Sequence, residues 1–107
     1  EGRVWLNPPY GPAAVPFIDR MVAHRNGILL VAARTETRWF QGAVSEADIV
    51  CFLGERIHFI HGLTGKQSRS SHASVLMGWG DESVAAIRRA DLGWTVEQIT
   101  DDKEIRE

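Results

Sequence analysis

Two consecutive prolines, Pro8 and Pro9, follow the apolar run Val4-Trp5-Leu6 and restrict what the chain can form next. Proline lacks a backbone N–H and fixes φ at about −65°, so neither a helix nor a central strand can continue through this point. The residues before the prolines have the composition of a short strand. We therefore predict a strand over residues 3–6 that ends in a rigid turn, followed by a Pro/Gly-rich loop over residues 7–13.

Asn7 and Tyr10 flank the two prolines and give the turn its chemistry. A rigid turn can direct the Asn7 side-chain oxygen and a backbone carbonyl at one point, with the Tyr10 ring beside it. Two acceptors converging on an amino group, next to a flat ring, suit an adenine or cytosine flipped out of a nucleic acid. The alternative is a purely structural proline turn. We favour the amino-group site and assign it to Asn7, Pro8, Pro9 and Tyr10.

Helix-like and strand-like segments alternate along the rest of the chain. The predicted segments are a helix from Val15 to Val22, a buried strand over 28–33, a helix over 37–46, a buried strand over 48–53, a half-exposed strand over 56–60, a strand over 73–79 and a helix over 81–89 with Asp81 as N-cap. The polar segment from His61 to His72 is either a functional loop or disordered. Trp5, Trp39, Trp79 and Trp94 are most simply core residues.

Strand, helix, strand, helix and strand in succession imply a mostly parallel α/β sheet with flanking helices. An antiparallel strand is expected near the C-terminal part. In parallel sheets the functional loops lie beyond the carboxyl ends of the strands. Here these loops begin at Asn7, at Arg34 and near Gly54, so the proline turn lies where this architecture predicts a site.

Length and composition indicate a single α/β domain over residues 1–99 with a charged tail over residues 100–107. No apolar stretch approaches the roughly 20 residues of a membrane span, and no signal peptide is visible, so we expect no membrane partner. Cys51 lies in an apolar run and is predicted to be a buried thiol. One cysteine permits no internal disulfide, which fits the cytoplasm.

The net charge of −2 is unevenly distributed. From Asp81 onward there are eight acidic and four basic residues, whereas the preceding part has six acidic and eight basic ones. Arg20, Arg25, Arg34 and Arg38 lie in one stretch, so a local basic face is possible without a basic protein. The four histidines lack an accompanying cysteine or carboxylate cluster, and we predict no metal site.

Three segments together resemble a known family: residues 7–11, residues 32–40 with Ala-Arg-Thr-Glu-Thr-Arg-Trp, and residues 49–59. They resemble the phage-type DNA N6-adenine methyltransferases from about Arg3 to Trp79. The Asn-Pro-Pro-Tyr motif alone is shared with cytosine-N4, RNA and protein-glutamine methyltransferases. The stretch over residues 32–40 narrows the choice to the adenine enzymes.

The resemblance implies S-adenosylmethionine-dependent methylation of adenine N6 in DNA, with Asn7 and Pro8 accepting hydrogen bonds from the amino group and Tyr10 stacking on the base. It also implies DNA contacts from residues on the same rim and on the following loop: Arg34, Thr35, Arg38, Trp39, Lys66 and Arg69. Arg34 and Arg38 could instead pair with Glu36 or Glu46. The 66–72 loop could close over DNA or be a disordered surface loop.

Methyltransferases of this fold also have a cofactor-binding half with a glycine-rich or acidic turn, for which no matching segment is found here. The resemblance therefore implies the C-terminal, target-base half of a partial Rossmann-like methyltransferase fold, which alone would bind S-adenosylmethionine poorly. Its cofactor-binding residues are unknown. The free strand edge would favour a homo-oligomer. The alternatives are a non-catalytic prophage remnant, a nucleic-acid-binding module, or a methyltransferase acting on RNA or a glutamine amide.

Overall fold

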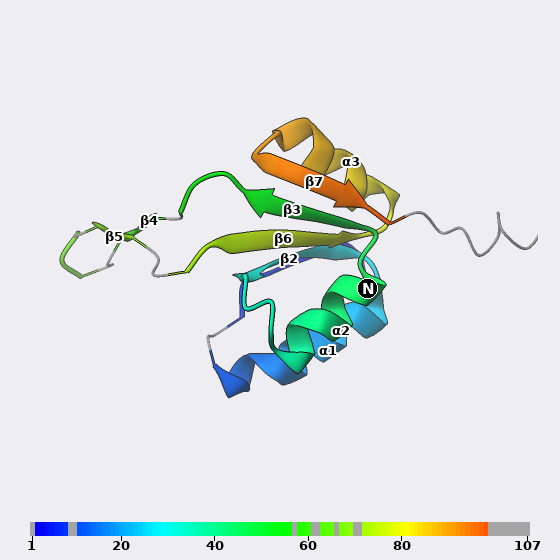
Figure 1. Ribbon diagram of the computed structural model, residues 1–107, viewed down its shortest axis with the longest axis horizontal. Coiled ribbons are helices and arrows are strands. Elements are labelled where there is room, and N and C mark those ends of the chain that lie inside the picture. Colours follow the sequence, from blue (N-terminus) through cyan, green and yellow to red (C-terminus); the bar gives the residue numbers. More distant parts are fainter. Residues whose placement is uncertain are drawn as a thin grey trace, which may run out of the picture.

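A five-stranded mixed sheet with helices on both faces forms the centre of the computed structural model (Figure 1). The structure describes residues 2–8, 11–56, 58–60, 63–65, 67–69 and 72–98. The helical elements are a 3-10 turn η1 (Pro12–Ala14), α1 (Val15–His24), α2 (Arg38–Glu46) and α3 (Asp81–Ala90). The strands are β1 (Val4–Leu6), β2 (Gly27–Ala32), β3 (Ile49–Leu53), β4 (His58–Ile60), β5 (Gln67–Arg69), β6 (Ser74–Trp79) and β7 (Gly93–Glu97).

The strand order is β1-β2-β6-β3-β7, and among the described strands only β1 and β2 pair in parallel. The pairs β2–β6, β6–β3 and β3–β7 are antiparallel. The expectation of a mostly parallel, Rossmann-like sheet is therefore wrong, although the α/β class and a late antiparallel strand are confirmed. The physical reason is β6, which returns directly after β3 and enters between β2 and β3. Those two strands keep the same direction but are no longer neighbours.

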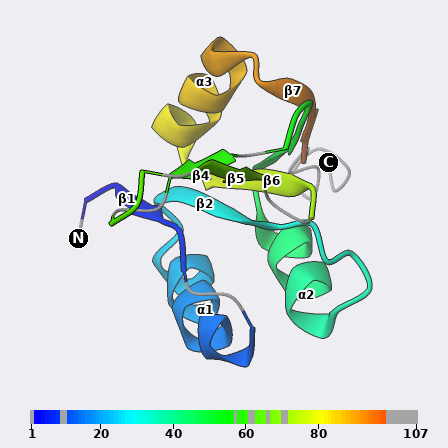
Figure 2. The same cartoon turned by 90° about the vertical axis from the view of Figure 1, so that its left-hand side faces the viewer.

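Helices α1 and α2 cover one face of the sheet, and α3 covers the other (Figure 2). Odd-numbered positions of β2 and β6, such as Leu29 and Met77, pack with Ile18 and Phe40 from α1 and α2. On the opposite face, Ile49, Cys51, Leu76 and Ile87 form a second cluster. Central strands with apolar side chains on both faces are buried on both sides, as the run over residues 28–33 predicted.

Local sequence signals account for the starts of α1 and α2 but not for the start of α3. The Thr37 side chain accepts a hydrogen bond from the Phe40 N–H and caps α2. Pro16 lies in the first turn of α1, and Arg25 ends that helix in the left-handed conformation. At α3 the N-cap is Gly80, so Asp81 is the first helical residue and the prediction of Asp81 as the cap is wrong. Its carboxylate still lies at the positive end of the helix dipole.

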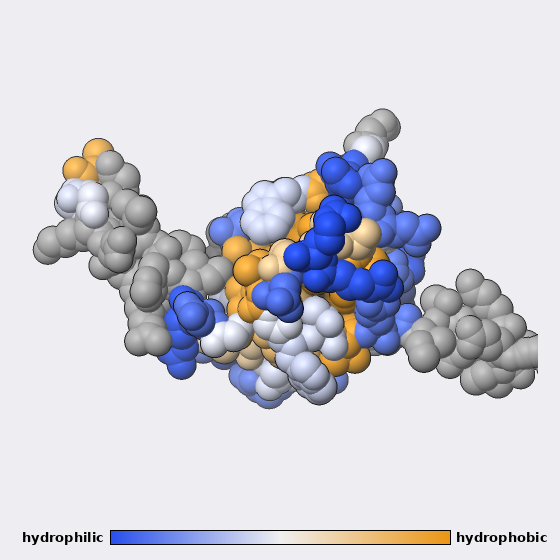
Figure 3. Space-filling view, turned by 90° about the horizontal axis from the view of Figure 1, so that it is seen from above, coloured by the Kyte–Doolittle hydropathy of each residue, from blue (hydrophilic) through white to orange (hydrophobic). Residues whose placement is uncertain are grey.

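The tryptophans divide between core and surface. Trp79 is fully buried and Trp39 is half-buried, whereas Trp5 is 61% exposed and Trp94 is 73% exposed. The prediction of a core role is therefore wrong for Trp5 and Trp94. Both lie on the outermost strands, β1 and β7, where one neighbouring strand is missing. Figure 3 views the side of α3 and β7, where apolar surface lies between charged side chains.

Cys51 is buried, as predicted, and its burial raises the pKa of the thiol, with Asp91 adding in the same direction. Within the part of the chain that the structure describes, no helix is long and apolar enough to cross a bilayer. The charged tail predicted over residues 100–107 lies outside the described residues.

Candidate functional site

The first three strands of the main sheet all end on the same side of the molecule. β1 runs parallel to β2, and β2 and β3 are both antiparallel to β6, so these three strands share one direction. The loops that begin at Asn7, Arg34 and Gly54 therefore leave the sheet at one end, which is on the left in Figure 1. We call this the carboxyl end of the sheet. The three loops thus leave the sheet at one end despite the antiparallel strand between β2 and β3.

Asn7 lies beside a step in the edge of the sheet. Leu6 pairs with Leu29, while β2 continues for three more residues to Ala32. At about 3.3 Å per residue, β2 rises roughly 10 Å beyond the end of β1. Asn7 is exposed, and Pro8 directly after it is buried. The buried ring anchors the turn while the carboxamide stays accessible.

The other two residues of the motif, Pro9 and Tyr10, lie outside the described residues. Beyond them, Gly11 has a φ of +83° and precedes η1. A positive φ of this size suits glycine, because the Cβ of any other residue would clash with the adjacent backbone carbonyl there. The backbone therefore changes direction at Gly11, just before η1 and α1.

The loop after β2 is fixed by its own backbone. The Thr37 N–H and hydroxyl both donate to the Arg34 carbonyl, at 3.0 and 2.8 Å, and the Gln41 amide donates to the Thr35 carbonyl at 2.6 Å. The Arg34 guanidinium lies 3.4 Å from Glu36, so the alternative of pairing with Glu36 is realised for Arg34. Both side chains are largely exposed, and such pairs contribute little stability. The Arg34 side chain can therefore exchange this carboxylate for another anion.

Arg38 and Trp39 begin α2 close to the same end, but they point toward α1. Both line a cleft of about 610 Å³ between the two helices, together with Val15 and Ile18. Trp39 also meets Phe40 edge to face, with ring centroids 5.7 Å apart. Arg38 is exposed and makes no ion pair with any residue in the described ranges, because Glu46 pairs with Arg25 instead.

A two-stranded hairpin, β4–β5, projects from the carboxyl end of the sheet (Figure 1). It connects β3 to β6 and contains Arg69 in β5, while Lys66 lies outside the described residues. The Ala33 N–H donates to the Ala73 carbonyl at 2.8 Å, so the base of the hairpin adjoins the Arg34 loop. The pKa of Glu36 is lowered first by a backbone hydrogen bond and further by Arg34 and His72. Arg34 from one segment and His72 from the other thus both lower the pKa of this carboxylate.

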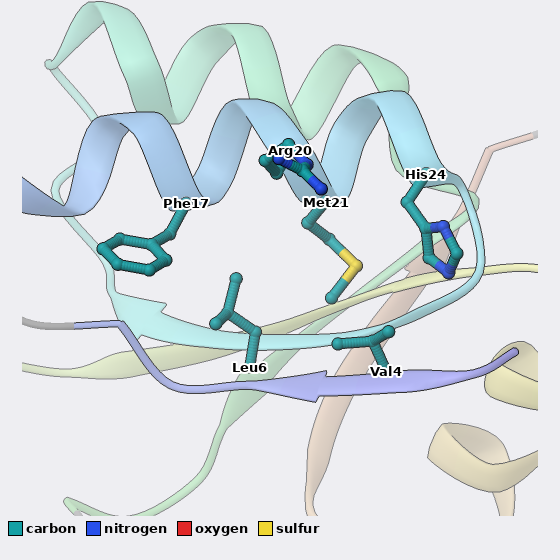
Figure 4. Close-up of a pocket in the computed structure, with 6 residues that line it drawn as sticks. All are labelled: Val4, Leu6, Phe17, Arg20, Met21 and His24. Atoms are coloured by element: carbon teal, nitrogen blue, oxygen red, sulfur yellow. The ribbon is translucent and has the colours of Figure 1, made fainter. Parts of the chain in front are cut away.

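A second cleft, of about 360 Å³, lies between α1 and the free edge of β1 (Figure 4). Val4 and Leu6 point from β1 toward Phe17 and Met21 on α1, and the polar lining consists of Arg20 and His24. Among the described residues that line this cleft there is no carboxylate to hold the hydroxyls of a ribose or an amino-acid ammonium group. The described lining therefore does not fit S-adenosylmethionine. Among the described residues, no group of three or more His, Cys, Asp or Glu side chains could hold a metal ion.

Comparison with known protein families identifies the chain. The family model described as DNA N-6-adenine-methyltransferase (Dam) matches residues 1–88. The chain belongs to the Dam family. The resemblance inferred from residues 7–11, 32–40 and 49–59 is confirmed, because all three segments lie within the match. No match was found among curated proteins or among solved structures.

The Dam-family match covers the whole carboxyl end of the sheet, including Asn7, Arg34 and the β4–β5 hairpin. Sequence analysis placed the first two but did not predict β5. Residues 67–69 are Gln-Ser-Arg, a polar triplet without the apolar alternation that indicates a strand. The available signal was Gly62 and Gly65, which bracket a turn between a short strand and this triplet.

Proposed function

We propose that this Dam-family chain forms the target-base part of a DNA adenine-N6 methyltransferase that uses S-adenosylmethionine. The observation that supports this most directly is the arrangement at the end of β1. An exposed asparagine is followed by a buried proline, beside a step in the sheet edge and next to an arginine-containing loop. The family match supports adenine in DNA as the substrate.

In this proposal Asn7 and Pro8 hold the amino group of the adenine. The Asn7 Oδ1 and the Pro8 carbonyl accept the two N6–H bonds, and Tyr10 stacks on the ring, which is worth about 1–3 kcal/mol per base. With both N–H bonds directed at fixed acceptors, the nitrogen lone pair points out of the ring plane and is available to an electrophile. The residues act by positioning and charge compensation, and no strong base is required.

Arg34 and Arg38 are proposed to contact phosphates beside the target nucleotide, with Thr35 and Trp39 on the same rim. Lys66 and Arg69 would contact the DNA backbone from the hairpin. Phosphate contacts of this kind fix the orientation of the duplex without reading its sequence. Each one also releases counterions, so binding should weaken as salt is raised. This explains how a chain with a net charge of −2 can bind DNA through one end.

S-adenosylmethionine supplies an activated methyl group when it is bound in a methyltransferase. Since the cleft beside β1 lacks the side chains that this cofactor needs, we propose that another segment or subunit holds it. The same observation favours a second candidate function, a module that binds DNA without transferring a methyl group. A methyltransferase acting on RNA or on a glutamine amide would use the same two acceptors.

The test measures methyl transfer from labelled S-adenosylmethionine to duplex DNA, RNA and protein in parallel. It uses this chain and the longest reading frame that contains it, with N6-methyladenine identified after digestion of the DNA. We expect N6-methyladenine from the longer frame. We also expect Asn7→Ala to lower kcat by about 10²–10³-fold, the effect of removing one positioned polar group from an active site.

The matched control is Asn26→Ala, because Asn26 is the other asparagine of the chain and precedes β2 at the opposite end of the sheet. It should retain activity. DNA binding without methylation by either protein would favour the non-catalytic module. Full activity in Asn7→Ala, or methylation of RNA or protein alone, would contradict the proposal.

A further inference from the structure

The last strand of the main sheet, β7, has an unpaired edge with apolar side chains. Within the described residues it pairs only with β3, and it lies at the margin of the sheet in Figure 2. Four of the eight exposed large apolar side chains in the described chain lie on β7 or beside it: Phe52, Leu92, Trp94 and Val96. The Dam-family match ends at residue 88 and therefore does not account for this edge.

Phe52, Trp94 and Val96 form one surface, which we call the β7 patch. In the register of β3 and β7, Trp94 is opposite Phe52 and Val96 is opposite Val50, so these side chains share one face of the sheet. Val50 is buried there with α1 and α2, whereas Trp94 and Val96 are 73% and 44% exposed. The rings of Phe52 and Trp94 lie 6.0 Å apart. The patch thus extends the apolar face of the sheet past the cover of α2.

The backbone of β7 points away from β3 at every second residue. The Gly54 N–H donates to the Leu92 carbonyl at 3.0 Å, and the Gln98 N–H donates to the Asp48 carbonyl at 2.9 Å. Because this alternation continues through an antiparallel ladder, the even-numbered residues of β7 direct their backbone at β3. The odd-numbered residues direct their N–H and C=O groups outward: Gly93, Thr95 and Glu97.

The edge of β7 lacks the features that usually prevent pairing with another chain. Such features are lysine, proline or a bulge, and β7 reads Gly-Trp-Thr-Val-Glu in an unbroken register with β3. Its one charged side chain, Glu97, is paired with Arg88 of α3. The edge is therefore open to a further strand.

The geometry points to a second copy of this chain as the partner. We propose that two copies pair antiparallel through β7 about a two-fold axis at Thr95. Thr95 then faces Thr95 of the second copy, and Gly93 faces Glu97 of the second copy, so every outward backbone group meets another. Three such pairs give about six backbone hydrogen bonds. This inference goes beyond the proposed function and does not depend on it.

The side chains are self-complementary in the same register. Trp94 faces Val96 of the second copy, at a Cα spacing of about 4.5 Å, and aromatic and β-branched residues are favourable partners across strands. The two β7 patches therefore join into one apolar surface. Since Glu97 faces a glycine, no like charges are placed opposite each other.

The expected dimer is weak. Two tryptophan side chains bury at most roughly 300–500 Å². This is up to half of the roughly 1,000 Å² that a specific interface requires, and Phe52, Val96 and the strand backbones supply the rest. Association should therefore depend on protein concentration. It leaves β1, at the other margin of the sheet, accessible.

Amide exchange measured by NMR at several protein concentrations tests the pairing on the unmodified chain. The exchange of the outward Thr95 N–H should slow by about tenfold where about nine tenths of the chain is paired. The Trp94 N–H is directed at β3 in the monomer as well and serves as the internal reference. Trp94→Lys should remove the concentration dependence at Thr95, whereas Trp5→Lys, on the opposite edge, should retain it.

A disulfide tests the two-fold register. The Cα atoms of the two Thr95 residues would lie about 5.5 Å apart, so Thr95→Cys should give a covalent dimer on mild oxidation. Cys51 lies opposite Thr95 in the same chain, so Cys51→Ala is included in this variant. Val96→Cys in the same background is the matched control, because its two copies would lie roughly 8 Å apart, too far for a disulfide.

Exchange at Thr95 that is independent of concentration, or a dependence that survives in Trp94→Lys, would overturn the β7 dimer. Failure of Thr95→Cys to crosslink, or equal crosslinking by Val96→Cys, would overturn the register about Thr95. Neither measurement uses DNA or S-adenosylmethionine, so these outcomes leave the proposed function intact.

Discussion

Replacing Gly27 by alanine tests whether the close approach of β1 to β2 holds the Asn7 turn in place. A Cβ at Gly27 would lie 2.2 Å from the Val4 carbonyl oxygen, whereas ordinary contacts begin at 3.4 Å. The Met21 side chain at 3.0 Å is flexible and can yield, but the Val4 carbonyl is backbone. Relief of the clash must therefore move β1 by more than an ångström, which is enough to break a ladder hydrogen bond.

The cost follows from how β1 is held. Within the part of the chain that the structure describes, it pairs only with β2, over three register positions. At about 0.5–1.5 kcal/mol for each net hydrogen bond, displacing the strand should lower the free energy of unfolding by about 2–4 kcal/mol. Because domains of this kind are stable by about 5–15 kcal/mol, the variant should still fold. Asn7, directly after β1, should lose its fixed position.

Urea unfolding of the Gly27→Ala variant measures this loss, and amide exchange at Trp5 and Leu6 shows whether β1 is the part that moves. Gly42→Ala is the matched control, because a Cβ at Gly42 meets nothing within 4 Å on the exposed side of α2. That change should raise the free energy of unfolding by about 0.5–1 kcal/mol. A Gly27→Ala variant as stable as wild type, with unchanged exchange in β1, would refute the reasoning.

Three further predictions concern stability and assembly. Ser83 has a fully buried hydroxyl without a partner in the described structure, so Ser83→Ala should raise the free energy of unfolding by about 1 kcal/mol in urea titrations. Glu97 is paired with Arg88, and this pairing lowers the pKa of Glu97 from its ordinary value of 4.5. The stability that the pair contributes is therefore present above pH 4.5 and is lost as the pH falls through the lowered pKa. Glu97→Gln should flatten that acid limb in thermal unfolding at different pH values, and an unchanged limb would contradict it. Trp5 is exposed on the edge strand β1, so we propose that two copies of the chain pair along this strand. Trp5→Lys should then shift the sedimentation coefficient toward that of the monomer. Equal sedimentation of both proteins would exclude β1 as the pairing edge.

The local elements of this chain could be predicted because their signals are local. Helix α2 was predicted over residues 37–46 and occupies Arg38–Glu46 with Thr37 as its cap. The apolar run over residues 28–33 became β2, buried against clusters on both faces. Capping, hydrophobic periodicity and the restrictions that proline imposes act within a few residues. They can therefore be recognised in the sequence without knowing which elements pack together in the fold.

Neighbour relations between strands depend on contacts far apart in the sequence and were predicted less well. The apolar run of β6 indicated burial, but not that β6 pairs with β2 on one side and β3 on the other. The exposure of Trp5 and Trp94 was missed for a related reason. An apolar residue is not obliged to be inside, and only the sheet order shows that β1 and β7 are edges.

The position of β6 also explains why the hairpin lies at the carboxyl end of the sheet. A chain that leaves β3 and returns as an antiparallel neighbour must reverse direction beyond the carboxyl end of β3, which is also the end where β1 and β2 stop. Because β6 lies next to β2, the segment that leads into β6 passes beside the Arg34 loop. The hydrogen bond from the Ala33 N–H to the Ala73 carbonyl joins the two. A parallel connection would have carried the chain back across a face of the sheet instead. The place of β6 between β2 and β3, which the sequence did not predict, is therefore what brings the hairpin to the end of the sheet where β1 leads into Asn7.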